Sequence, residues 1–118
     1  MEDTIVSQAT PSGFSAISIV RLSGKKALAF SKALTKKEAP GHKKPILSSI
    51  YIKNNLIDKG MITAFHSPNS YTGEDVVEIA CHGNPNITKS IIEEVISFGG
   101  RLAEPGEYTK RAFLNGKL

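Results

Sequence analysis

The chain has 118 residues, of which 40% are hydrophobic and 22% are charged, and its formal net charge at pH 7 is +4. This length and composition are typical of one folded domain with its own core and argue against an intrinsically disordered chain. There is no apolar run long enough to cross a bilayer, and the single cysteine, Cys81, excludes an internal disulfide, so we expect a cytoplasmic protein without a membrane partner.

Two β-rich stretches and a helix are predicted in the first third of the chain. Residues 4–9 (TIVSQA) and 15–22 (SAISIVRL) are predicted strands, separated by the breaker stretch TPSG. Ser23 stands at the position of an N-cap, so we predict a helix over residues 24–34.

Three further strands are predicted in the middle of the chain. Residues 46–53 and 56–65 are β-rich, and the Asn54-Asn55 pair between them tolerates positive φ, so the two strands form a predicted hairpin. A loop rich in proline, asparagine, serine and glycine follows, and residues 76–82 then alternate as a strand.

The clearest helix signal begins at Asn84, an N-cap residue that places Pro85 at the first helical position. Four apolar residues recur on one face of this predicted helix: Ile87, Ile91, Val95 and Phe98. The Gly99-Gly100 pair ends it through a left-handed conformation. A short strand over residues 101–103 and a tail that forms a turn and a short helix complete the chain.

The order of these elements predicts the fold class. It is an α+β fold with a mixed, largely antiparallel sheet of about five to six strands and two main helices on one face. We expect residues 1–118 to form a single domain.

The positive charge is concentrated in residues 35–44 (TKKEAPGHKK), which hold two lysine pairs around Pro40 and Gly41. A solvated loop is favoured over an RNA contact. No aromatic residue alternates with these lysines to stack on a base, and this weakens the RNA interpretation further.

Several kinds of reaction centre are absent from the sequence. RLSGKK lacks the upstream glycine and the hydroxyl residue of a phosphate-binding loop, and GxGxxG does not occur. Cys81 and His82 are adjacent in a strand and point to opposite faces, so they form neither a chelating pair nor a catalytic pair. His42 and His66 lie in predicted loops without partners at ligand spacing. We expect no hydrolytic catalysis by this chain alone.

Glu78 is an unusual residue for the centre of a strand. With period two, Val77, Ile79 and Cys81 face the core, while Glu78 shares the other face with Ala80 and other residues. A carboxylate on that face can accept hydrogen bonds from a polar ligand or from a partner protein. Equally, it can point to water or pair across the strand with a lysine.

Arg21 and Lys117 are two further candidate binding residues. Arg21 lies in a strand with apolar residues on both faces, where a guanidinium must be paired. A structural ion pair or snorkelling at the strand end is as favoured for it as anion binding. Judged from its position alone, Lys117 is a solvated lysine near the end of the chain.

Four segments together resemble one family. DTIVSQATPSG, SIVRLSG, PNSYTGEDVVEIACHG and RLAEPGEYTKRAFLNGKL resemble, in order and spacing, the amino-terminal domain of the tRNA-modification GTPases called MnmE or TrmE. The segment over residues 25–59 is generic. The first loop, TPSGFSA, is poorer in glycine than is usual in the family, and HGNP stands where the family has HGG.

The resemblance implies a fold and a ligand. The family's domain is similar to the folate-binding domain of the glycine-cleavage T-protein, dimerises, and binds a one-carbon tetrahydrofolate such as 5-formyltetrahydrofolate. Motif matching places the family's folate-binding positions at Arg21, Glu78 and Lys117. A pterin presents an amide N–H beside an exocyclic amine, and one carboxylate can accept both hydrogen bonds.

The resemblance also implies a larger protein. The family continues past LNGKL into a helical domain with an inserted GTPase, so GTP, potassium and magnesium belong to parts outside this chain. With MnmG, an FAD-containing partner, the whole protein modifies the wobble uridine of tRNA at carbon 5. Two alternatives stay open: a stand-alone relative of the folate-dependent aminomethyltransferases, and a basic tRNA-contacting or purely structural dimerisation module without folate binding.

Overall fold

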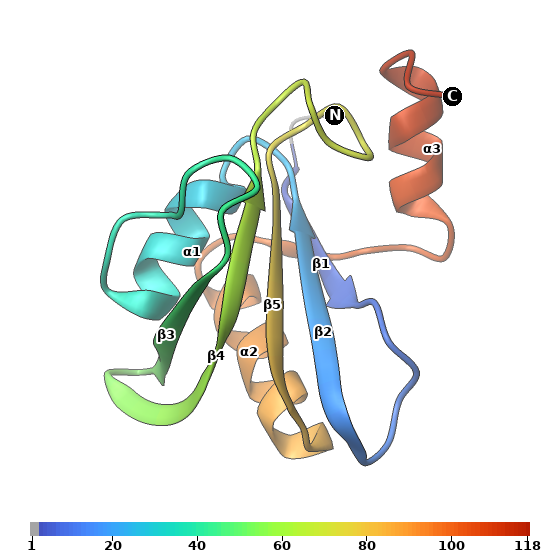
Figure 1. The fold of residues 1–118 in the computed structure, drawn as a ribbon. Helices are drawn as coiled ribbons and strands as arrows, with labels where there is room; N and C mark the ends of the chain where they lie inside the picture. The colour runs from blue at the N-terminus through green and yellow to red at the C-terminus, as the bar shows by residue number, and fades with distance from the viewer. Residues whose placement is uncertain (1–2) are drawn as a thin grey trace.

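The computed structural model describes residues 3–118, which form one sheet of six strands with three helices (Figure 1). In chain order the elements are β1 (Ile5–Gln8), β2 (Ser15–Ser23), α1 (Ala27–Thr35), β3 (Ile46–Ile52), β4 (Asn55–Phe65), β5 (Val76–Gly83), α2 (Pro85–Ser97), β6 (Arg101–Leu102) and α3 (Glu107–Leu114). The strands lie in the order β3-β4-β5-β2-β1-β6. Helices α1 and α2 cover one face of the sheet, while α3 stands apart from them (Figure 1).

The sheet is mixed, as the sequence predicts. Every neighbouring pair of strands is antiparallel except β1 and β6, which pair in parallel at one edge. The parallel pair follows from the connection through α2, because a crossover helix returns the chain in its original direction. The predicted α+β class and strand number are confirmed.

The face beneath α1 and α2 carries the hydrophobic core. Its strand residues come from the inward positions of the period-two pattern, and α2 adds Ile91 and Val95 from its apolar stripe. Val77, Ile79 and Cys81 are buried there, as predicted for β5. The buried cluster consists of Val6, Val20, Leu22, Ala27, Phe30, Leu34, Ile50, Ile62, Ala64, Val77, Ile79, Cys81, Ile91 and Val95.

Helix α2 begins and ends as predicted. The Asn84 side chain accepts a hydrogen bond from the Asn86 N–H, and Pro85 occupies the first turn. Gly99 has φ +113, and the following Gly100 N–H closes the end of the helix onto the Val95 carbonyl.

Two local predictions are wrong. Ser23 does not cap α1; it ends β2, where its hydroxyl bonds Thr72 and Glu74 at 2.8 and 2.7 Å, and the helix begins only at Ala27. The β3–β4 turn has positive φ at Lys53 and Asn54 rather than at Asn54 and Asn55. A buried carboxylate explains this shift by one residue, because Glu94 of α2 accepts the Lys53 N–H at 2.8 Å and fixes the turn.

Within residues 3–118, no helix combines the length and apolar character that crossing a bilayer requires.

Candidate functional site

A pocket of about 250 Å³ opens on the face of the sheet that α1 and α2 leave uncovered. It lies between the sheet and the loop that joins β4 to β5. The lining residues come from β2, β4, β5 and that loop: Arg21, Phe65, Tyr71, Thr72, Val76 and Glu78. The pocket therefore contains two of the three predicted binding residues, Arg21 and Glu78.

Arg21 and Glu78 are paired directly across β2 and β5. Both Arg21 Nε and Nη2 donate to the same carboxylate oxygen, Glu78 Oε2, at 2.9 and 2.8 Å. Among the described residues, none donates a hydrogen bond to Glu78 Oε1. The side chains are 32% and 28% exposed, so both reach the pocket and neither points into bulk solvent.

The ion pair shows which partner each of the two side chains has in the described part of the chain. Glu78 pairs across the strand with Arg21 and not with a lysine, and Arg21 has the structural partner that its position required. The pair does not preclude binding, because a ligand can still reach the second carboxylate oxygen. The folate-binding roles of Arg21 and Glu78 stay predictions.

Tyr108 of helix α3 packs against Arg21 and bonds its backbone. The Tyr108 ring lies 5.5 Å from the Arg21 guanidinium carbon, within cation–π range. Its hydroxyl donates to the Arg21 carbonyl at 2.7 Å and accepts from the Ser7 hydroxyl at 3.0 Å. Burial raises the pKa of Tyr108, so the hydroxyl remains a donor at neutral pH.

A second pocket, of about 390 Å³, adjoins the first. It is lined by Lys43, Phe65, Asn69, Ser70, Tyr71 and Lys117. The two pockets share Phe65 and Tyr71, which form the wall between them. Lys117 therefore does not stand beside Glu78, and the structure places the third predicted binding residue in the neighbouring pocket.

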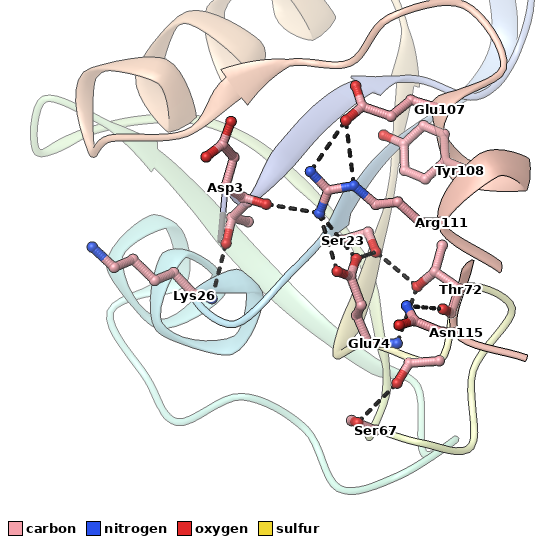
Figure 2. Close-up of polar contacts among 12 residues, drawn as sticks. Asp3, Ser23, Lys26, Ser67, Thr72, Glu74, Glu107, Tyr108, Arg111 and Asn115 are labelled. Carbon is pink, nitrogen blue, oxygen red and sulfur yellow. Dashed lines mark hydrogen bonds and ion pairs between the residues drawn. The ribbon is translucent and has the colours of Figure 1, made fainter. Parts of the chain in front are cut away.

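Arg111 holds α3 against the rest of the molecule (Figure 2). Its side chain is only 2% exposed and donates in three directions. Nη1 reaches the Asp3 carbonyl at 2.7 Å and both Glu74 oxygens at 3.1 Å, while Nε and Nη2 reach Glu107 Oε2 at 3.3 and 3.1 Å. One buried guanidinium thus joins the chain's beginning, the β4–β5 loop and α3.

The same network extends into the wall of the first pocket (Figure 2). Glu74 accepts from the Ser23 hydroxyl, which also bonds the Thr72 hydroxyl. The Asn115 side chain donates to the Thr72 carbonyl at 2.8 Å. Thr72 is therefore held by β2 on one side and by the residue that follows α3 on the other, so the end of α3 helps to position the wall of the pocket.

Comparisons with known proteins identify the family. The family model described as "GTP-binding protein TrmE N-terminus" matches residues 4–117. The chain belongs to the TrmE amino-terminal family. Its relatives include the tRNA modification GTPases MnmE of Francisella philomiragia subsp. philomiragia (52% identical over 120 residues), Aliarcobacter butzleri (50% over 117) and Helicobacter acinonychis (47% over 118).

These relatives are longer proteins. The matches cover 99%, 98% and 100% of this chain, respectively, but 26% of each relative. The chain thus spans about a quarter of the length of the curated relatives it matches.

Sequence reasoning missed several residues of this TrmE-family site. Tyr71, Tyr108 and Arg111 were not singled out, because a loop tyrosine and a charged helical tail carry no signal that they meet a distant strand. The available signals were the strings PNSYTGEDVVEIACHG, which contains Tyr71, and EPGEYTKRAFLNGKL, which contains Tyr108 and Arg111; both carried the resemblance without saying what each residue does.

His42 and His66 lie close together, which the sequence analysis did not predict. His42 Nδ1 accepts the His66 backbone N–H at 2.9 Å, and His66 Nε2 lies 3.2 Å from the Pro40 carbonyl. These contacts fasten the lysine-rich loop (residues 35–44) to the end of β4; both join a ring nitrogen to a backbone group and are not a metal-ligand pairing. No third metal-type side chain joins them within residues 3–118.

The adjacent Cys81 and His82 behave as the strand period requires. Cys81 is buried in the core, and burial followed by the charge of Asp58 raises the pKa of its thiol to about 11. His82 is exposed and its Nδ1 lies 2.7 Å from Asp58 Oδ1. Burial raises the pKa of Asp58, but hydrogen bonds from the His82 backbone and ring outweigh it and leave this pKa below its usual value. The thiol of this TrmE-family chain is therefore not a nucleophile at neutral pH.

Proposed function

We propose that the chain is the folate-binding, dimerising amino-terminal domain of a GTPase that modifies tRNA. The whole protein acts on the wobble uridine at carbon 5 together with the FAD-containing partner MnmG, in the cytoplasm. GTP, potassium and magnesium are used by domains outside this chain. Family membership and the names of the relatives, which are tRNA modification GTPases, support this proposal.

The observation that carries the folate proposal is the position of Glu78. Its carboxylate projects from the middle of β5 into a pocket with the aromatic rings of Phe65 and Tyr71. A flat heterocycle can pack against such rings while its polar edge meets the carboxylate. A pterin offers an N–H and an amine side by side, which is the donor pattern that an acceptor-only carboxylate requires.

Arg21 holds the Glu78 carboxylate in an orientation suited to accepting hydrogen bonds from a ligand. Because it binds only Oε2, it fixes the orientation of Glu78 and balances its charge while Oε1 has no partner among the described residues. Tyr108 in turn fixes Arg21. The site is therefore largely preorganised before a ligand arrives, which lowers the entropy cost of binding.

The direct test is calorimetric titration of the chain with 5-formyltetrahydrofolate. We expect Glu78→Gln to weaken binding by about 30-fold, since hydrogen bonds to a charged group contribute about 1.5 to 3 kcal/mol. A glutamine amide is uncharged, so its oxygen accepts hydrogen bonds from the pterin more weakly, and its NH2 group can only donate. The measurement is the dissociation constant, with thermal stability recorded for each variant.

Glu93→Gln is the matched control, because Glu93 is an exposed carboxylate on α2 far from this pocket in the fold. It should leave the dissociation constant unchanged. Equal affinity of the Glu78→Gln variant and the wild type would contradict the proposed role of Glu78. Absence of binding by the wild-type chain would contradict the folate proposal itself.

The uncovered sheet face also supports dimerisation. Leu47, Met61 and Ala80 are paired across β3, β4 and β5 on that face, and Ile17 of β2 lies close by along a hollow of about 210 Å³. Leu47, Met61 and Ile17 are exposed. Exposed apolar side chains gathered on one face mark an association surface, and identical chains most often associate as twofold dimers.

The double substitution Ile17→Lys/Leu47→Lys is expected to convert a dimer to a monomer. Two like charges introduced on each chain remove apolar burial from a twofold interface and add repulsion between the chains, which should weaken association by at least about tenfold. Sedimentation equilibrium measures the dissociation constant. Leu102→Lys, on the exposed edge strand β6, is the control and should leave the dimer intact; persistence of the dimer in the double variant would contradict this interface.

A further inference from the structure

The second pocket has the chemistry of an anion site. Among residues 3–118, its lining includes two lysines, Lys43 and Lys117, and no carboxylate residue. The remaining polar groups are the side chains of Asn69 and Ser70 and the Tyr71 hydroxyl, which suit hydrogen bonds to oxygen. A negatively charged ligand is therefore favoured over a neutral or cationic one.

Lys43 belongs to the lysine-rich loop but is not free to move with it. Its backbone N–H donates to the Ala64 carbonyl at 2.8 Å, and the preceding His42 is bonded to the His66 N–H. Its φ of +58 is rare for a residue other than glycine, and such a conformation persists only when neighbouring contacts hold it. The loop is thus built to present Lys43 at the end of β4.

Lys117 is fixed from the opposite side. Its backbone N–H donates to the Ala112 carbonyl at 2.8 Å, and its side chain passes close to Gly73. A Cβ at Gly73 would lie 3.3 Å from Lys117 Cγ and 3.0 Å from Asn115 Cβ. The absence of a side chain at Gly73 therefore lets the chain end approach the β4–β5 loop and bring Lys117 to the pocket.

The two pockets together match an elongated ligand. One holds a carboxylate for a polar heterocycle, the other holds two cations, and Phe65 and Tyr71 stand between them. The Tyr71 hydroxyl is 3.0 Å from the Thr109 hydroxyl of α3, which fixes this dividing side chain. A folate has the same order of parts: a heterocycle, an aromatic ring and an anionic glutamate.

We propose that Lys43 and Lys117 bind the carboxylates of a γ-linked glutamate chain, so that the site prefers polyglutamylated tetrahydrofolates over the monoglutamate. This inference rests on the proposed function and assigns its substrate class. Each added glutamate carries one more carboxylate, and two flexible lysines can contact successive carboxylates without a fixed bidentate geometry. Lys43 is then a specificity-determining residue for the length of the tail.

The experiment compares 5-formyltetrahydrofolate carrying one glutamate with the same compound carrying three, by calorimetry on the chain at low and at high salt. The wild type should bind the triglutamate about tenfold more tightly at low salt, as expected for two partly exposed ion pairs. Lys43→Gln should reduce this gain to about twofold while changing monoglutamate binding little. The gain should shrink at high salt.

Lys44→Gln is the matched control. Lys44 has the same charge, lies in the same loop and is exposed, but does not line the pocket. It should leave the full preference for the triglutamate in place. An equal loss in both loop variants would show a general effect of loop charge and would overturn the specific site.

Other outcomes of the same experiment distinguish a failure of this inference from a failure of the folate-binding proposal on which it rests. Tight monoglutamate binding with no gain from the longer tail would overturn the inference and leave the proposed function standing. Failure of both ligands to bind would overturn both. Loss of tRNA binding in the Lys43→Gln variant, with no triglutamate preference in the wild type, would assign the lysines to RNA phosphates instead.

Discussion

Replacing Arg111 with methionine is expected to lower the free energy of unfolding by about 3 to 5 kcal/mol. The guanidinium is buried and binds two carboxylates, those of Glu74 and Glu107, as well as the Asp3 carbonyl. Methionine preserves much of the volume but leaves both carboxylates without this partner in a poorly hydrated site. Urea denaturation of the chain measures the change.

Arg101→Met is the control for this substitution. Arg101 also pairs with Glu107, at 2.7 Å, but its side chain is 40% exposed. An exposed pair contributes little, so the expected loss is below about 1 kcal/mol. The stability loss of Arg111→Lys should lie between those of Arg101→Met and Arg111→Met, since lysine keeps the charge but lacks the several N–H donors of the guanidinium. Equal costs for Arg101→Met and Arg111→Met would contradict the role assigned to the buried network.

The Arg111 network also connects stability to the candidate site. Thr72 and Tyr71 form walls of the first pocket, and both are bonded to residues of α3 or its end. Lys117 lies three residues after the last residue of α3. The segment that the sequence presents as a tail therefore holds two wall residues of the first pocket and supplies Lys117 to the second, and loosening it at Arg111 should disturb binding and folding together.

Local patterns were sufficient wherever a short segment determines its own structure. The alternation in β5 separates a core face from a polar face, and this placed Glu78 on the uncovered side of the sheet. In α2, the Asn84 cap predicts where the helix begins, and the apolar stripe predicts which side of the helix is buried. In each case a repeat of two or 3.6 residues matches burial on one face.

Long-range contacts were not visible in the same way. The sequence predicts Ser23 as a helix cap, because a serine hydroxyl often accepts a hydrogen bond from the first turn of a helix. In the structure the hydroxyl instead bonds Thr72 and Glu74, which lie about 50 residues away in the sequence. Arg111 contacts Asp3 from 108 positions away. Lys43 looked like one solvated lysine among several, since only the fold brings Lys117 to the same pocket.

Acid is expected to remove a defined part of the stability through Glu107. Hydrogen bonds from Arg101 lower the pKa of Glu107 most, with burial opposing them and the Glu104 N–H and Arg111 adding to them, and the result is a pKa of about 2. The folded-state pKa is thus below the unfolded value of about 4.3. The folded state favours the charged form, so this stabilisation is complete above the unfolded pKa and is lost as pH falls from about 5 to about 2.

The size of this effect follows from the shift. A displacement of about two pKa units corresponds to about 3 kcal/mol, and solvent around the partly exposed Arg101 reduces the expected contribution to about 2 kcal/mol. Glu107→Gln should therefore be about 2 kcal/mol less stable than the wild type at pH 7, and the difference should nearly vanish at pH 2. Urea is the denaturant of choice because guanidinium chloride would screen the ion pairs.

Glu104→Gln is the control, because Glu104 is an exposed carboxylate three residues before Glu107, and this substitution should leave the pH profile unchanged. A constant difference in stability between the wild type and Glu107→Gln from pH 7 to pH 2 would mean that Glu107 stabilises the fold by packing rather than by its charge.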